Sequence, residues 1–258
     1  MQKKYIFFDY DGTLAIPLTY KVPADTQQAL ELLAKNGHFL SLATGRLQAD
    51  AVHFLDGLPF DNALADGGRS IMLDGELKWT RPLDFEPTLK CLLALDAKGY
   101  EWAVIPENKL MRYTPFPDFD KDSKYFIPTT YVPNITPNSF KSFYKVYVKV
   151  AWGEAQRALV NSEPMRGIPW CSSTLEQIFI EPTEKAAGIE RVMSMLGAPI
   201  KDVVVFGDGN NDLSMFSDAW TNIAMGNAIL KLKKRATYIT DDVDAGGIYN
   251  ACKHFGWI

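Results

Sequence analysis

The sequence predicts an α/β fold: a doubly wound, mostly parallel, Rossmann-like core that is interrupted by an inserted α+β domain. Two short runs, residues 5–8 and 202–206, consist almost wholly of apolar residues, which is typical of strands buried on both faces of a parallel sheet. Helix-like and strand-like segments alternate in the first and last thirds. The middle third differs, because six of the fifteen prolines lie between Pro106 and Pro137.

The first third is expected to alternate strands and helices. A helix over 25–36 has apolar residues at helical spacing and ends at Gly37, a residue type that commonly terminates helices. A core strand over 38–43 follows and leads into Thr44-Gly45-Arg46. The remaining elements expected in this third are a helix to about Leu55, a strand over 62–65, and strands over 70–73 and 76–79 joined by an Asp74-Gly75 hairpin turn.

The middle of the chain, residues 82–182, is expected to form the inserted domain. Its expected elements are helices over 84–98 and 154–161, a hairpin of strands 100–105 and 109–113, and strands over 144–150, near 170 and over 177–180. The core then resumes. The elements expected there are a helix from Lys185 to Leu196 capped by Thr183, the strand 202–206, a helix opened by residues 207–212, strands over 221–225 and 237–240, and a helix after Asp244.

The composition limits the partners that can be expected. The chain has 258 residues, a formal net charge of −4 and no cluster of lysine and arginine, so no nucleic-acid partner is expected. Its three cysteines are widely separated, which favours reduced thiols over disulfides. The N-terminal apolar run is too short for a secretory signal and no stretch could span a membrane, so we expect a cytoplasmic protein without a membrane partner. The oligomeric state stays open.

Carboxylates follow both buried strands of the predicted core. Asp9 and Asp11 come directly after the first strand, and Asp208 and Asp212 follow the strand 202–206. The carboxyl ends of parallel strands meet at one edge of the sheet, where such folds bind ligands. Carboxylates gathered there repel one another unless a cation neutralises them. Oxygen ligands without histidine or cysteine suit Mg²⁺, so the sequence predicts a magnesium site.

Two more residues supply groups for binding phosphate. Thr44 ends the strand 38–43 and Lys185 begins a helix, so a hydroxyl and an ammonium group are available at the same edge. Phosphoryl transfer through an aspartyl-phosphate requires a carboxylate, a metal, a lysine and a hydroxyl. Taken alone, the segment 5–13 could equally be an ordinary strand followed by an Asp-Gly turn, but the later segments supply the partners that catalysis needs.

Four segments resemble, in order, the four motifs of the haloacid dehalogenase superfamily: Asp-Tyr-Asp-Gly-Thr at 9–13, Leu-Ala-Thr-Gly-Arg at 42–46, Lys185, and Gly-Asp-Gly-Asn-Asn-Asp at 207–212. The tail segments 224–228 and 244–248, together with the place of the insert, resemble the Cof-type (class IIB) branch. The resemblance implies a catalytic core made of residues 1–81 and 183–258, and an α/β cap, residues 82–182, that selects the substrate.

The resemblance also implies a role for each matching residue. Asp9 would be the nucleophile and Asp11 the general acid and base. The groups implied to hold Mg²⁺ are Asp9, the carbonyl of Asp11, and Asp208, with Asp212 supporting them from behind. The groups implied to contact phosphate are Thr44, Lys185, Asn211 and the backbone at Gly12. Two positions stay open: Arg46 is either a substrate contact or a structural ion pair, and Asp66 replaces an asparagine that is frequent in the family.

The sequence therefore predicts a Mg²⁺-dependent phosphatase that acts through an aspartyl-phosphate. The expected partner is a small phosphorylated metabolite, with sugar phosphates as the expected class. One alternative is a phosphomutase of the same superfamily, and another is a non-catalytic protein that senses phosphate with a similar acidic site. The individual ester cannot be read from the sequence, because the cap that would select it matches no motif.

Overall fold

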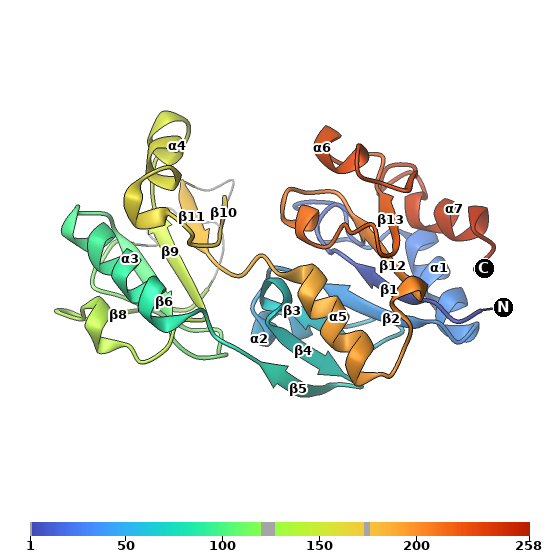
Figure 1. Ribbon diagram of the computed structural model, residues 1–258, viewed down its shortest axis with the longest axis horizontal. Helices are drawn as coiled ribbons and strands as arrows, with labels where there is room; N and C mark the ends of the chain where they lie inside the picture. The colour runs from blue at the N-terminus through green and yellow to red at the C-terminus, as the bar shows by residue number, and fades with distance from the viewer. Residues whose placement is uncertain (1, 120–126, 173–175) are drawn as a thin grey trace. The chain divides into compact units, whose positions relative to one another are not determined.

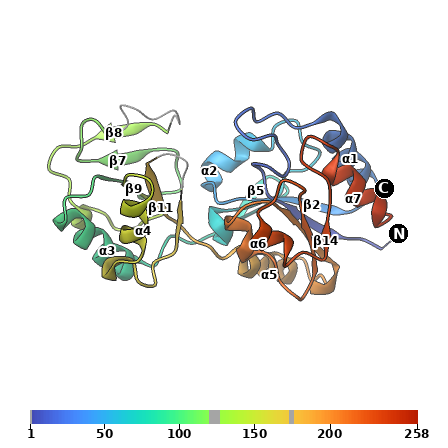
Figure 2. The same cartoon turned by 90° about the horizontal axis from the view of Figure 1, so that it is seen from above.

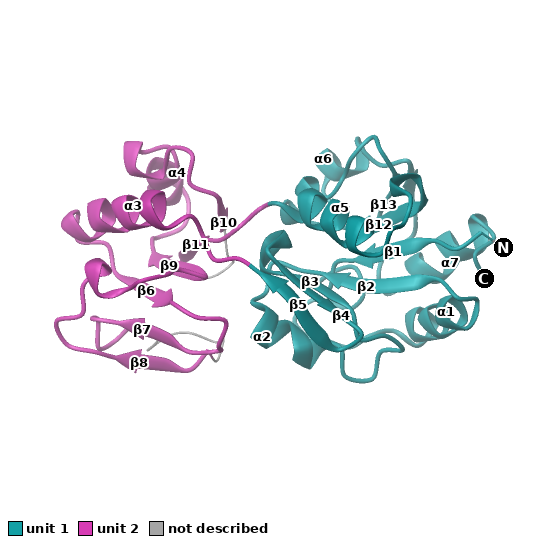
Figure 3. Ribbon diagram, turned by 60° about the horizontal axis from the view of Figure 1, so that its bottom comes forward, with its two compact units in different colours: residues 1–80, 184–258 teal, residues 81–183 magenta. Residues whose placement is uncertain are grey.

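The chain divides into two compact units, which are residues 1–80 with 184–258 and residues 81–183 (Figure 3). This division, and all geometry below, comes from a computed structural model that describes residues 2–119, 127–172 and 176–258. The first unit is built from both ends of the chain, so the second unit is an insertion in its sequence (Figure 1).

The first unit contains an eight-stranded sheet in the order β14-β13-β12-β1-β2-β3-β4-β5. Strands from β14 to β3 run parallel, and β4 and β5 are added as an antiparallel hairpin. Their bounds are β1 (Tyr5–Phe8), β2 (Phe39–Ala43), β3 (Ala63–Ala65), β4 (Ser70–Leu73), β5 (Glu76–Thr80), β12 (Val203–Gly207), β13 (Thr221–Ala224) and β14 (Tyr238–Ile239). The predicted α/β class with a mostly parallel sheet is confirmed.

Helices cover both faces of this sheet, with α1 and α7 on one face and α5 on the other (Figure 2). The helices of the unit are α1 (Ala24–Lys35), α2 (Gln48–Ala51), α5 (Lys185–Met195), α6 (Leu230–Lys233) and α7 (Gly247–His254), with short 3₁₀ turns η1 (Val52–Phe54), η2 (Asp66–Gly68), η5 (Ile200–Asp202) and η6 (Asn211–Ser214). Among the described residues, no helix combines the length and the apolar character that crossing a membrane requires.

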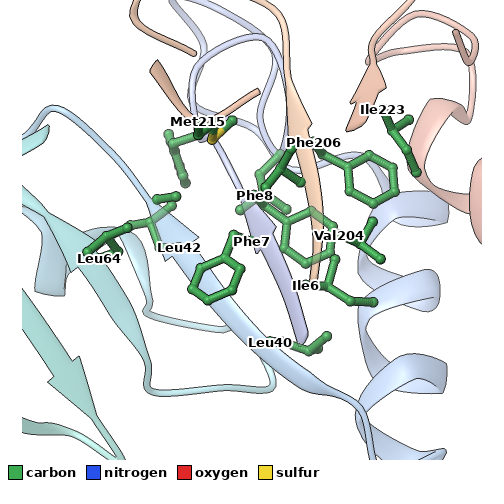
Figure 4. Packing of buried hydrophobic residues seen from close by; sticks show 14 of the residues in the cluster. Ile6, Phe7, Phe8, Leu40, Leu42, Leu64, Val204, Phe206, Met215 and Ile223 are labelled. Carbon is green, nitrogen blue, oxygen red and sulfur yellow. The ribbon is translucent and has the colours of Figure 1, made fainter. Parts of the chain in front are cut away.

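Strand β1 is the centre of the core. Ile6, Phe7 and Phe8 are all fully buried, and the Phe8 ring stacks on that of Phe206 in β12 at a centroid distance of 5.0 Å (Figure 4). A strand that is apolar at every position can bury both of its faces only when helices pack on both sides of the sheet. This burial fixes the end of β1, and with it the place where the first carboxylates emerge.

The β4–β5 hairpin turns where the Asp-Gly pair predicts. Asp74 and Gly75 have φ angles of 52° and 75°, as a tight turn with two left-handed residues requires, and glycine adopts such angles without steric cost. This prediction is confirmed.

The inserted unit has its own sheet and its own core. Six strands lie in the order β10-β11-β9-β6-β7-β8, and buried residues such as Trp102, Phe143 and Val146 form its apolar core. The bounds are α3 (Phe85–Ala97), β6 (Trp102–Ile105), β7 (Arg112–Thr114), β8 (Thr129–Tyr131), η3 (Pro137–Ser139), β9 (Lys145–Lys149), α4 (Glu154–Val160), η4 (Glu163–Met165), β10 (Trp170–Ser172) and β11 (Gln177–Ile180). The proline-rich stretch contains β8, although the sequence predicts only irregular structure there; residues 120–126 of that stretch lie outside the described part.

Two local predictions are wrong. Residues 207–212 open a single 3₁₀ turn, η6, instead of a helix, because the Asp212 carboxylate binds the amides of Asp208 and Gly209 and so holds the loop in another shape. Thr183 does not cap α5, since the residue before the helix is Glu184 and no side chain caps it. The Glu184 amide donates instead to the carbonyl of Gly67, at 2.7 Å, and its carboxylate pairs with Arg69.

Candidate active site

The two acidic strand ends lie side by side. Strands β1 and β12 pair in parallel with Phe8 opposite Phe206, and the Asp9 amide donates to the Phe206 carbonyl at 3.0 Å. Asp9 and Asp208 therefore leave the same edge of the sheet. Carboxylate oxygens of Asp9, Asp208 and Asp212 lie within 4.8 Å of one another. The structure thus brings together three of the four carboxylates that the sequence selects.

Lys185 joins this cluster from the first turn of α5. Its Nζ donates to Asp9 Oδ1 at 2.8 Å and to Asp212 Oδ1 at 2.6 Å, and its side chain is only 1% exposed. The turn η2 fixes where α5 begins, because Gly68 lies so close that a Cβ added there would be 2.3 Å from the Glu184 carbonyl oxygen. Only glycine fits at this close approach, and the approach sets the position of Lys185.

The charged groups in this cluster shift one another's pKa values. Burial raises the pKa of the Asp9 carboxyl well above its usual range, and the charge of Asp212 raises it further, while Lys185 acts in the opposite direction. Burial, and then Asp212, raise the pKa of Asp208 to about 7. Burial alone would lower the pKa of Lys185, but the charges of Asp212 and Asp9 outweigh it and hold that pKa above its ordinary value. Lys185 is therefore a permanent cation, and the carboxylates around it are under strain from mutual repulsion.

Asp212 differs from the other two carboxylates because both of its oxygens are already engaged. Oδ1 accepts from Lys185, and Oδ2 accepts from the backbone amides of Asp208, at 3.0 Å, and Gly209, at 2.9 Å. Among the described residues, no hydrogen bond is made to Oδ2 of Asp9 or to Oδ2 of Asp208. The oxygens open to a cation are therefore those of Asp9 and Asp208. Such an all-oxygen set fits Mg²⁺, while Asp212 holds the loop that carries Asp208.

The carboxylate of Asp11 does not join the cluster. It is 45% exposed and accepts from the Arg46 guanidinium at 2.9 Å. Arg46 also reaches Asp50, at 3.4 Å, and lies 4.0 Å from the centre of the Phe54 ring. Of the two alternatives for Arg46, the structure shows the ion pair. Asp11 lies beyond the end of β1 and after a turn in the chain, so its side chain is free to follow Arg46 instead of Asp9.

Two of the phosphate-binding candidates, Thr44 and Asn211, make no hydrogen bond to the cluster among the described residues. Thr44 is buried just after β2, and its Oγ1 accepts from the Arg46 amide at 3.1 Å. Asn211 begins η6 beside Gly209. Within the described part of the chain, no hydrogen bond joins either side chain to Asp9, Asp208 or Lys185. Thr44 follows β2, which pairs with β1, and Asn211 lies between Asp208 and Asp212 in sequence.

The backbone of Gly12 lies against Asp208, one of the candidate metal ligands. It has a φ angle of 87°, and a Cβ placed there would lie 2.3 Å from Asp208 Oδ2, so a side chain would occupy the space of that carboxylate. The neighbouring Thr13 donates from Oγ1 to Asp208 Oδ1 at 3.2 Å. The Thr13 contact is not expected from the sequence, although Thr13 is the last residue of the first motif.

Asp66 is a structural residue. It is buried with a φ angle of 51°, and its carboxylate accepts from the hydroxyl of Ser70 and from the Gln48 amide, at 3.3 Å. A carboxylate can accept from both donors at once, and Asp and Asn are among the few residues other than glycine that tolerate this backbone conformation. An aspartate at this position is therefore compatible with the backbone conformation and with both donors.

The fold and this cluster define the chain as an α/β enzyme with an acidic site at the carboxyl edge of a parallel sheet. The family of haloacid dehalogenase-like hydrolases matches residues 6–252, and the chain belongs to that family. The predicted family membership is confirmed.

Relatives of similar length align along the whole chain. YkrA of Bacillus subtilis is 25% identical over 258 residues, which cover 99% of each protein. The 5-amino-6-(5-phospho-D-ribitylamino)uracil phosphatase YwtE of Bacillus subtilis is 24% identical and covers 95% of each. The solved structure of a haloacid dehalogenase subclass IIB sugar phosphatase has a TM-score of 0.79 and 25% identity, and the match covers 99% of this chain and 100% of that one.

Proposed function

We infer that the chain is a Mg²⁺-dependent phosphatase that hydrolyses phosphate esters of small polyhydroxylated metabolites through an aspartyl-phosphate. The observation that carries this proposal is the buried contact of 2.8 Å between Asp9 and Lys185, at the edge where Asp208 also emerges. A carboxylate buried beside a fixed cation is held at one place and in one orientation, as in-line attack on phosphorus requires.

The proposed reaction has two displacements at phosphorus. A carboxylate oxygen of Asp9 forms a bond to phosphorus while the ester P–O bond breaks, and Asp11 gives its proton to the departing alkoxide. Water then attacks the phosphorus of the aspartyl-phosphate, Asp11 takes a proton from this water, and the bond between phosphorus and Asp9 breaks. Inorganic phosphate leaves, and both carboxyl groups return to their starting states. In this scheme Asp11 leaves Arg46 to reach the substrate, which its exposed position permits.

Positive charge is the other requirement of the reaction. Asp9, Asp208 and the carbonyl of Asp11 are the groups that would hold Mg²⁺, whose charge offsets that of the transferred phosphoryl group. Lys185 supplies a second positive charge from within the protein. Thr44, Asn211 and the backbone at Gly12 are proposed to donate to the phosphate oxygens, while Asp212 keeps Lys185 and the Asp208 loop in place.

The proposed substrate class rests on the relatives. One relative is named for a phosphate on a ribityl chain and another is named a sugar phosphatase, so both names describe phosphate on a polyol. Polyol alkoxides are poor leaving groups, which makes a general acid such as Asp11 valuable. The inserted unit, residues 81–183, is proposed to select among such esters.

Phosphate release from a panel of phosphate monoesters tests this proposal. The purified chain, assayed with Mg²⁺ and with EDTA, should turn over sugar and polyol phosphates in the presence of Mg²⁺ alone. A requirement for a bisphosphate activator, with transfer to another hydroxyl, would identify a mutase instead. Binding of phosphate without turnover of any ester would identify a sensor.

A further inference from the structure

The Asn227 side chain connects two parts of the first unit that are far apart in sequence. Its Nδ2 donates to the carbonyl of Gly12 at 2.8 Å, and its Oδ1 accepts from the amide of Val243 at 2.9 Å. Asn227 is exposed, yet both ends of its amide are hydrogen bonded. The first acidic loop, residues 9–13, is thereby tied to the segment that follows β14.

The segment that carries Asn227 also binds the second acidic loop. The Met225 amide donates to the Gly207 carbonyl at 3.0 Å, and the Ile229 amide donates to the Asp208 carbonyl at 2.9 Å. Residues 225–229 therefore hold both loops from which metal-binding carboxylates emerge. These contacts to the Asp208 loop are made by backbone, whereas the contact to the Gly12 loop is made by the Asn227 side chain.

The distance between these loops has little freedom. The Gly12 backbone lies directly against the Asp208 carboxylate, as the 2.3 Å approach of a Cβ built there shows. The Gly12 carbonyl that Asn227 binds lies in the peptide group after the Gly12 Cα, and the Asp11 carbonyl lies in the peptide group before it, so a shift of Gly12 would also move the Asp11 carbonyl relative to Asp208. Metal ligands must keep their spacing to within a few tenths of an ångström for Mg²⁺, which demands near-ideal octahedral geometry.

Among the described residues, one side-chain hydrogen bond joins Gly12 or Thr13 directly to the Asp208 loop, and that is the bond of Thr13 to Asp208 Oδ1. This hydrogen bond depends on the ionisation state of the Asp208 carboxylate. The Asn227 bond does not, since it is made between a neutral amide and a backbone carbonyl. It can therefore hold the Gly12 peptide in place whether or not Asp208 is ionised.

We propose that Asn227 is a positioning residue for the magnesium site: it fixes the Gly12 peptide against Asp208 and thereby sets the spacing of the Mg²⁺ ligands. The inference rests on the proposed function, because it assumes that Asp9, Asp208 and the Asp11 carbonyl bind the metal. The competing explanation is that Asn227 merely closes the turn between β13 and residue 243. The two explanations predict different effects on metal affinity.

The test is calorimetric titration of Mg²⁺ into the full-length Asn227→Ala protein, with melting in EDTA measured in parallel. Mutation of a residue that holds a metal ligand in place typically lowers metal affinity by about 10- to 100-fold, and we expect a loss of Mg²⁺ affinity in this range. Asn36→Ala is the matched control, since Asn36 is also exposed and also donates from Nδ2 to a distant backbone carbonyl, that of Trp257, at 2.8 Å. The control should lower the melting temperature by a similar amount and leave Mg²⁺ affinity unchanged.

Three results decide the matter. Unchanged Mg²⁺ affinity in Asn227→Ala, or an equal loss in Asn36→Ala, would overturn the proposal while leaving the phosphatase in place. Absence of Mg²⁺ binding to the wild-type chain would instead overturn the proposed function. Should Asn227→Ala not fold, Asn227→Gln serves in its place, because it keeps both amide groups but displaces them by one methylene. A weaker Mg²⁺ affinity in that variant supports the proposal, and wild-type affinity contradicts it.

Discussion

Lys185 and Asp9 form an ion pair of 2.8 Å in which the two side chains are 1% and 6% exposed. Removing two charges from water is costly, and the attraction between them offsets that cost only if the geometry holds. Asp212 completes the arrangement at 2.6 Å, so a single cation faces two buried carboxylates. This arrangement lies at the edge of the sheet where a phosphate ester is proposed to bind.

Replacing Lys185 tests how far its charge offsets those of Asp9 and Asp212. Lys185→Met leaves Asp9 and Asp212 buried without their cation, and breaking such a pair typically costs about 3–5 kcal/mol in the free energy of unfolding. Adding Asp9→Asn should recover part of that loss, because it removes one of the two unpaired charges. Neither variant should hydrolyse phosphate esters. Denaturant unfolding and phosphate release measure the two effects.

Lys145 provides a matched control for this experiment. Its side chain is 12% exposed and also pairs with a carboxylate, that of Glu181, but it belongs to the inserted unit. Lys145→Met should destabilise the protein and yet leave hydrolysis of the small substrate p-nitrophenyl phosphate. If Lys185→Met were as active as Lys145→Met, Lys185 would have only a structural role.

The nucleophile can be identified from the covalent intermediate. Asp9→Asn keeps the shape of the side chain but removes the attacking charge, so turnover should fall by on the order of 10³-fold or more. Acid quenching during turnover of ³²P-labelled ester should trap label on the wild-type chain and none on this variant. Label of equal amount on Asp9→Asn would place the covalent bond on another residue.

The loss of activity in Asp11→Asn should depend on the leaving group of the substrate. A protonated acid matters most when the departing alkoxide is strongly basic, as with sugar phosphates, and least with p-nitrophenolate. We therefore expect a larger loss of kcat/KM on sugar phosphates than on p-nitrophenyl phosphate. Equal losses on both substrates would show that Asp11 is not the general acid.

The pH dependence of stability follows from Asp208. Its pKa is about 7 in the folded, metal-free protein, against about 3.9 in an unfolded chain. Between these values the folded state retains a proton that the unfolded state has lost, so this carboxyl contributes stability below about pH 4 that is lost as the pH rises through 7. In EDTA, Asp208→Asn should melt above the wild type at pH 8, and the difference should narrow towards pH 5.

Like the Asp208→Asn substitution, Mg²⁺ should stabilise the wild-type fold. Mg²⁺ should raise the melting temperature of the wild-type chain at pH 8, and this increment should shrink in Asp208→Asn, which lacks one ligand. The charge of Asp208 is one of the causes that raise the pKa of Asp9, so Asp208→Asn also relieves Asp9 and adds to the difference in the same direction. An Asp208→Asn variant that is plainly less stable than the wild type in EDTA at pH 8 would indicate that Asp208 mainly stabilises the loop through Thr13.

Parts of the site that depend on strand ends are predictable from the sequence. Two runs of apolar residues identify β1 and β12, and the parallel pairing of such strands places Asp9 next to Asp208. Lys185 follows from its position at the start of a helix. These inferences need only local pattern and the geometry of parallel sheets, and the structure agrees with both strand positions.

Other parts depend on contacts that no local pattern encodes. Arg46 pairs with Asp11 while its guanidinium lies over the Phe54 ring, and the Asn227 bond joins residues 215 positions apart. The turn η6 replaces a helix because a side chain, Asp212, competes for backbone amides. The first two features depend on tertiary contacts, and in the third a local contact between a side chain and the backbone outweighs the helical preference of the segment.

The pairing of β1 with β12 has a consequence for how the protein is made. Tyr5 and Val203 are register partners that lie 198 positions apart, so at typical synthesis rates about 10–40 s pass between their emergence from the ribosome. During this interval one edge of β1 has no partner, while the inserted unit, with its own core, can already fold. The strand that leads to Asp9 therefore stays unpaired along this edge until residues 203–207 have emerged.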